Sequence, residues 1–102
     1  MVKVLGGENM PRVGFIEKTI YKQEGIDVKF FKDGKDVRGD LFLANNYKAG
    51  NRTKNNMNVK FLKEKLKAQY PGYDFEIYNG DGAKVHGNVT LGKVRDTYDE
   101  EE

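Results

Sequence analysis

The side chains that most often carry catalysis are scarce in this chain of 102 residues. It contains no cysteine and no serine, and its one histidine is His86. Thiol and serine nucleophiles, disulfides and thiolate metal sites are therefore excluded. General acid–base catalysis by His86 would need a carboxylate beside it, and Asp74 and Asp81 are the candidates. No motif places either one there, so we expect no catalytic residue and no enzyme.

Carboxylates gather once in a way that could suggest a metal site, at Asp33, Asp36 and Asp40. A calcium loop needs oxygen ligands at closely alternating positions and a closing glutamate, and this spacing is missing. Lys35 and Arg38 lie between the acids, which indicates charge neutralisation at a surface. The chain also has no glycine-rich phosphate loop of the P-loop or dinucleotide type. We therefore expect no metal and no cofactor.

The most distinctive candidate site is a basic segment rich in asparagine. Residues 44–58 include six asparagines and a glycine, a composition typical of a long loop. Cations continue along one flank of the helix that we expect next. Lysine and arginine bind phosphates, asparagine amides read base edges and a tyrosine ring offers a stacking surface. The candidate nucleic-acid contacts are Tyr47, Lys48, Arg52, Lys54, Lys60, Lys63 and Lys67. An ordinary solvated surface is the alternative interpretation.

Residues 58–70 carry the clearest helical pattern. Apolar side chains recur on one stripe at Val59, Leu62, Leu66 and Tyr70. Asn58, or Asn55 or Asn56 slightly earlier, can cap the first turn, and the Tyr70-Pro71-Gly72 sequence ends the helix. Met57 and Phe61 fall on nearly the opposite side. They either touch a second helix or a partner molecule or, in the case of Phe61, pack under the preceding loop.

The remaining residues favour strands. Residues 12–43 predict a three-stranded antiparallel meander, with a first strand from Val13, a second that buries Ile26, Val28 and Phe30, and a third over 37–43. Asp33-Gly34 predicts the hairpin between the last two. Residues 73–78 form a fourth strand and 83–85 a short fifth. Thr90 caps a short helix with Leu91, Val94 and Tyr98 on one side, or a last strand runs through Val94.

This order of elements predicts an α+β fold with a single, mostly antiparallel sheet of four to five strands. One main helix, about 58–70, packs on one face, a short C-terminal helix is possible, and the order is compatible with a β-grasp-like arrangement. Residues 1–11 are expected to be a flexible N-terminal segment and 12–98 a single domain. An acidic tail occupies 99–102.

The codons for the residues before Met10 can spell a ribosome-binding stretch. A further hypothesis is therefore that translation naturally begins at Met10.

Charge and hydropathy narrow the class of partner. The net charge is +2, yet five acids lie in the last seven positions, so residues 1–95 carry 18 basic and 11 acidic side chains. No apolar run approaches the ~20 residues that span a bilayer, and no signal peptide is evident, so we expect a cytoplasmic protein without membrane contact.

We therefore predict a small non-enzymatic binding module. Its partner is a protein bound through the sheet or through the Met57 and Phe61 side. The alternative is an accessory nucleic-acid-binding protein that uses the basic segment 47–67. The sequence leaves the oligomeric state open.

Overall fold

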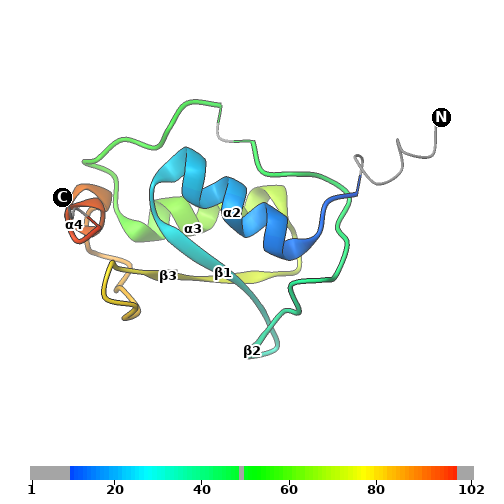
Figure 1. The fold of residues 1–102 in the computed structure, drawn as a ribbon. Coiled ribbons are helices and arrows are strands. Elements are labelled where there is room, and N and C mark those ends of the chain that lie inside the picture. The colour runs from blue at the N-terminus through cyan, green and yellow to red at the C-terminus, as the bar shows by residue number, and fades with distance from the viewer. Residues whose placement is uncertain (1–9, 49, 99–102) are drawn as a thin grey trace.

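The computed structural model describes residues 10–48 and 50–98 and has an α+β fold (Figure 1). Three strands form one antiparallel sheet in the order β2-β1-β3. The elements in chain order are α2 (Val13–Glu24), β1 (Asp27–Lys32), β2 (Lys35–Asp36), α3 (Val59–Gln69), β3 (Asp74–Tyr78) and α4 (Leu91–Asp96). The sheet thus has fewer strands than the four to five we predicted, and the described part of the chain has three helices.

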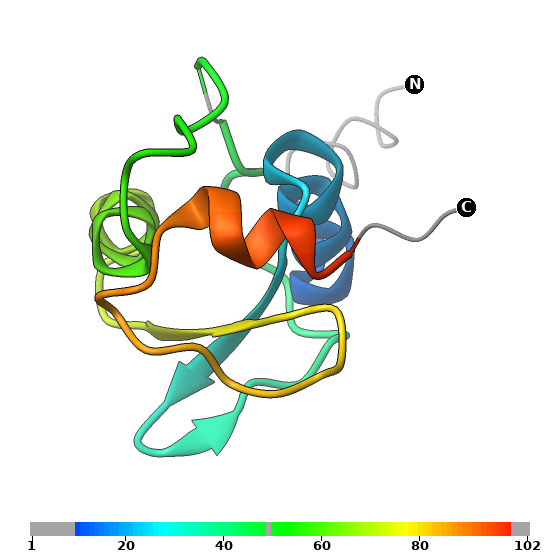
Figure 2. The ribbon, with the colours of Figure 1, turned by 90° about the vertical axis from the view of Figure 1, so that its left-hand side faces the viewer.

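The elements form two layers. Helices α2 and α3 lie side by side on one face of the sheet, α2 against β1 and α3 against β3 (Figure 1). The short helix α4 lies across one end of this layer (Figure 2). The segment that joins β2 to α3 runs over the helices on the side away from the sheet. Helices α2 and α3 therefore contact the sheet on one side and this connecting segment on the other. The candidate site lies where the connecting segment meets the helices.

The core between the layers follows the alternation of the strands. Val28 and Phe30 of β1 are buried beside Ile77 and Phe75 of β3, their register partners. Ile26, just before β1, is also buried, as predicted. The β1–β2 hairpin turns at Asp33 and Gly34, both with positive φ (55° and 79°). Two positive φ values are what a tight hairpin turn requires, so the Asp-Gly signal was read correctly.

The prediction of a strand at the start of the meander is wrong, because Val13–Glu24 is a helix. Its composition of β-branched and aromatic residues suggests a strand, yet its buried residues are Val13, Ile16, Ile20 and Glu24. Spacings of three, four and four residues place these side chains on one helical face. Gly25 ends the helix in the left-handed conformation (φ 74°), and its N–H donates to the carbonyl of Tyr21. The packing of one face therefore overrides the local strand preference.

The other missing strands are replaced by irregular chain. Over 37–43, the Leu41 N–H donates to the carbonyl of Arg38 in a turn, and pairing is limited to a single Arg12–Phe42 bridge. Residues 83–85 return along β3 but pair only at the Tyr78–Lys84 bridge. Because the described chain opens with a helix, the β-grasp-like order is not observed in it.

Two predicted helices are present. Helix α3 begins after Asn58, whose side chain accepts a hydrogen bond from the N–H of Phe61, and it ends at Gln69 before Pro71. Its buried stripe is the predicted one. The C-terminal alternative resolves in favour of the helix, which Thr90 caps by accepting from the N–H of Lys93. Leu91 and Val94 of α4 are buried.

The ends of the chain were predicted as a flexible segment and an acidic tail. Residues 1–9 and 99–102 lie outside the described residues, so these two predictions are not addressed. At the boundary, Pro11 is buried and its carbonyl accepts a hydrogen bond from the N–H of Leu43. None of the helices in the described ranges has the length and hydropathy needed to cross a membrane.

The helical assignment of α2 makes a sharp mutational prediction. Ile16 is fully buried, whereas the neighbouring Phe15 is 56% exposed. Ile16→Ala should therefore lower the free energy of unfolding by about 3 kcal/mol, since it removes core volume. Phe15→Ala should lower it by less than about 1 kcal/mol. Urea unfolding followed by circular dichroism measures both; the reverse ranking is what a strand burying Phe15 would give.

Candidate functional site

A buried carboxylate lies where the helices and the connecting segment meet. Glu24, the last residue of α2, has no exposed surface. Its Oε2 accepts from the hydroxyl of Tyr47 at 2.5 Å and from Thr53 Oγ1 at 3.1 Å, and its Oε1 accepts from the Thr53 N–H at 3.0 Å. Two residues of the connecting segment are thereby fixed to the end of α2.

Cations from three further positions complete this cluster. Lys65 Nζ of α3 lies 3.3 Å from Glu24 Oε2, and Arg95 Nη2 of α4 lies 3.1 Å from Oε1. Arg52 donates through Nε and Nη2 to the backbone carbonyl of Glu24 at 3.4 and 3.2 Å. We call Glu24, Tyr47, Arg52, Thr53, Lys65 and Arg95 the Glu24 cluster. It joins α2, the connecting segment, α3 and α4.

The electrostatics of Glu24 follow from these contacts. Burial by itself would raise its pKa, because it disfavours the charged form. The hydrogen bonds from Tyr47 and Thr53 and the charge of Lys65 outweigh burial, so the pKa of Glu24 is lowered below its ordinary value. Burial and the hydrogen bond to Glu24 raise the pKa of Tyr47. Glu24 is therefore ionised at neutral pH, and Tyr47 keeps its proton.

Two residues that we predicted as nucleic-acid contacts, Tyr47 and Arg52, belong to this cluster and have a structural role in it. Tyr47 is 2% exposed, so its ring is not available to stack on a base. Arg52 is exposed at the surface but is held over the end of α2. Lys48 and Lys54 are exposed, and the backbone of Lys48 exchanges two hydrogen bonds with the side chain of Gln69. The loop cations are thus separated from the predicted stacking residue.

The lysines on the flank of α3 face acidic residues of β3. Lys67 Nζ lies 3.1 Å from Asp74 Oδ1, and Lys63 Nζ lies 3.8 Å from Glu76 Oε1. Lys60 forms no ion pair with any described residue. The predicted row of three cations is therefore neutralised at two of its positions. Such half-exposed pairs add little stability, but they reduce the attraction of this flank for a polyanion.

The opposite side of α3 keeps its apolar groups accessible. Phe61 is 41% exposed and Met57 is half-buried. Both line a hollow of about 400 Å³ with Asn56, Asn58, Lys60 and Glu64. Phe61 therefore does not pack under the preceding loop, which was one of the two alternatives. Met57 and Phe61 instead form an accessible surface of the kind that a partner contact requires.

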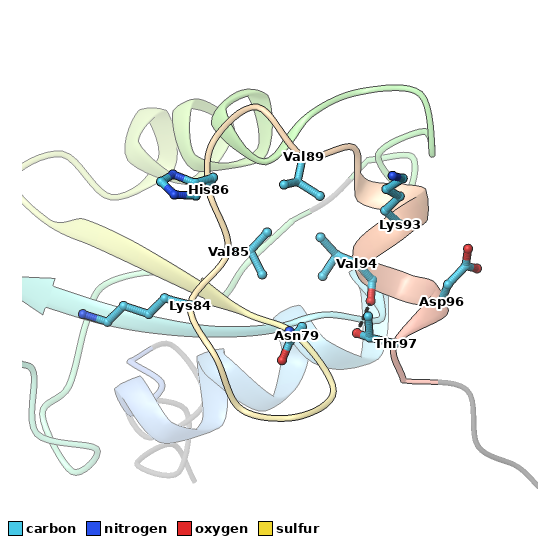
Figure 3. A pocket seen from close by; sticks show the side chains of 9 residues that line it. All are labelled: Asn79, Lys84, Val85, His86, Val89, Lys93, Val94, Asp96 and Thr97. Carbon is cyan, nitrogen blue, oxygen red and sulfur yellow. Dashed lines mark hydrogen bonds between the residues drawn. The ribbon is translucent and has the colours of Figure 1, made fainter.

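A second hollow, of about 490 Å³, lies between α4 and the turn after β3 (Figure 3). The side chains of Val85, Val89 and Val94 converge at its centre, and Lys84, Lys93 and Asp96 lie at its rim. Sequence reasoning missed it, because the hollow forms only when the irregular chain 83–89 lies beside α4. The alternating polar residues around Val85 and Val89 gave no signal beyond a short strand.

His86, the one candidate for acid–base chemistry, lines the same hollow as the carboxylate of Asp96. The side chain of His86 is exposed, and its ring turns away from the three valines (Figure 3). Neither Asp74 nor Asp81 lines this hollow. Within 10–48 and 50–98, no three histidine or carboxylate side chains come together as metal ligands would.

Comparison of the chain with protein-family models, with curated proteins and with solved structures finds no match. The function must therefore be argued from the surfaces themselves.

The Glu24 cluster predicts a pH-dependent stability. Because the folded-state pKa of Glu24 is lowered, its stabilisation is complete above the ordinary pKa of 4.5 and is lost as the pH falls through the folded value. Glu24→Gln should lower the free energy of unfolding at pH 7 by about 3 kcal/mol, since it leaves buried cations without their partner. The difference in the free energy of unfolding between wild type and Glu24→Gln should therefore disappear at acidic pH.

Urea unfolding from pH 7 to pH 3 measures this difference. Glu64→Gln is the matched control, because Glu64 is exposed and makes none of the ion pairs among the described residues. A Glu24→Gln loss that matches the control, or that stays constant down to pH 3, would contradict the assignment.

Proposed function

We propose that this chain is a small non-enzymatic interaction module that binds a protein partner through the outer side of α3. The observation that carries the proposal is the exposure of Phe61 on a helix whose inner side is fixed in the core. An aromatic side chain held on a rigid element loses little conformational freedom on binding, and aromatic residues are enriched among the side chains that dominate interface energies.

The hollow beside Phe61 defines the chemistry of the partner. An apolar side chain of the partner lies against Phe61 and Met57, and the amide groups of Asn56 and Asn58 supply a polar rim. Lys60 and Glu64 extend from the same rim, and neither forms an ion pair with a described residue, so a carboxylate placed near Lys60 and a cation placed near Glu64 are favoured. The partner is thus a protein segment with an apolar anchor flanked by charges of both signs.

The outer face of the sheet is a weaker candidate for the same role. Its positions alternate between charges, with Asp27 and Lys29 on β1 opposite Tyr78 and Glu76 on β3. Its half-buried Phe31 lies under Lys84, whose Nζ is 5.5 Å from the ring centroid. An aromatic ring already covered by a cation offers less apolar area to a partner than Phe61 does.

Nucleic-acid binding by residues 47–67 is a weaker candidate function than protein binding through the outer side of α3. The burial of Tyr47 removes the stacking surface, and acids of β3 neutralise Lys63 and Lys67. Lys60 also keeps its charge unpaired among the described residues, but it lies on α3 beside Phe61 and lines a different hollow from Arg52 and Lys54. Cations separated in this way suit a more compact ligand than a strand of nucleic acid.

The proposal is tested with a photo-crosslinking residue placed at position 61, and at position 15 as the control. Phe15 is an equally large exposed side chain but belongs to α2. A protein captured from position 61 is then purified and titrated with the full chain. Phe61→Ala should weaken this binding at least about tenfold, since anchors at interface centres contribute 2 kcal/mol or more.

Phe15→Ala should bind within about twofold of wild type, because it removes a ring outside the interface. Circular dichroism verifies that both variants stay folded. Equal binding by wild type and Phe61→Ala, or capture only from position 15, would overturn the proposal.

A further inference from the structure

A third hollow, of about 460 Å³, opens beside the Glu24 cluster and is lined by polar and charged residues. Four consecutive residues of the connecting segment and one residue of α4 form it: Arg52, Thr53, Lys54, Asn55 and Arg95. Three of these five side chains are cationic. The hollow lies apart from the outer side of α3, and neither Phe61 nor Met57 lines it.

The charges around this hollow do not balance. Among the described residues, Glu24 is the one carboxylate in contact with Lys65 and Arg95, and Arg52 reaches only its backbone carbonyl. Three cations thus share one negative charge, and Lys54 adds a fourth cation at the rim. Burial lowers the pKa of Arg95, and the nearby charge of Arg52 lowers it further. An anion in the hollow would offset this repulsion.

The hydrogen-bond donors of the two arginines are differently committed. Arg95 is fixed in place, since it donates to the carbonyls of Glu24 and Thr53, to Asn55 Oδ1 and to Glu24 Oε1. Arg52 donates only through Nε and Nη2 to one carbonyl, so its Nη1 group is not used within the described residues. The side-chain ammonium of Lys54 makes no hydrogen bond to a described residue, although its backbone carbonyl accepts from the N–H of Met57. These donors remain for a ligand.

Gly25 leaves the space that the guanidinium of Arg52 occupies. A Cβ at residue 25 would lie 2.0 Å from Arg52 Nη2, so the guanidinium occupies space that any other residue would fill. The glycine also has φ +74°, which favours glycine at the end of a helix. One residue thus ends α2 and lets Arg52 lie against its last turn.

We propose that this hollow binds a phosphate group through Arg52 and Lys54, with Arg95 as the fixed positive wall. A phosphate is compact and doubly charged, and its oxygens match the paired N–H groups of a guanidinium. The five lining residues are all polar or charged, so a ligand is held mainly by its charge and oxygens. The phosphate comes either from a small phosphorylated molecule or from a nucleic-acid backbone, which share this chemistry.

The test is a titration of the ¹⁵N-labelled full chain with inorganic phosphate against chloride at equal ionic strength. Saturable amide shifts should appear at 52–55 and 95. The double variant Arg52→Gln/Lys54→Gln should weaken binding about tenfold or more, since it removes the charge-assisted donors. The matched control is Lys35→Gln/Arg38→Gln, which removes the same charges at the β1–β2 hairpin and should bind like wild type.

Further arms separate the two sources. Pyrophosphate binding that a single-stranded oligonucleotide does not displace supports a small phosphorylated ligand. Tighter binding of the oligonucleotide at the same amides, lost in Arg52→Gln/Lys54→Gln, supports a backbone phosphate. Shifts that are absent, that chloride reproduces, or that both double variants lose equally would overturn the site. None of these outcomes depends on the Phe61 surface, so the two proposals fail separately.

Discussion

The architecture depends on the burial of one carboxylate, Glu24. A buried charge is costly unless hydrogen bonds and opposite charges compensate it, and here the connecting segment, α3 and α4 supply them. The asparagine-rich part of the segment between β2 and α3, residues 44–58, has few apolar side chains to anchor it. Tyr47 and Thr53 anchor it through Glu24. Without this carboxylate, Tyr47 and Thr53 would lose their hydrogen bonds to the end of α2, and the backbone hydrogen bonds of Val13 and Gly14 to residues 41 and 39 would remain at its start.

The same interaction decides which surfaces remain for binding. It takes Tyr47 into the interior and fixes Lys65 and Arg95, while it leaves the unused donors of Arg52 beside Lys54. On the far side of α3, Phe61 takes no part in the cluster and stays accessible. The basic segment 47–67, which looks uniform in sequence, is therefore divided into a structural part, a neutralised flank and an exposed polar hollow.

The sequence predicts an element well when the residues that determine it are close together in the chain. Helix α3 follows from a stripe of four apolar residues, an asparagine cap and a proline stop, all within 14 positions, so it was predicted closely. Helix α2 was not, because its buried face ends on a glutamate, and a charged residue is not expected in the core. The partners of Glu24 lie 23 to 71 residues away, so no local pattern indicates them. The hollow beside α4 has the same non-local origin.

The most direct test of this account is the titration of the Glu24 side chain itself. The ¹³C chemical shift of its carboxyl carbon, followed by NMR in the folded protein, reports the pKa of this one group. The account predicts a pKa below the ordinary glutamate value of 4.5, because the hydrogen bonds and cations outweigh burial. A pKa at or above that value would mean that burial dominates and that the cations do not surround the carboxylate.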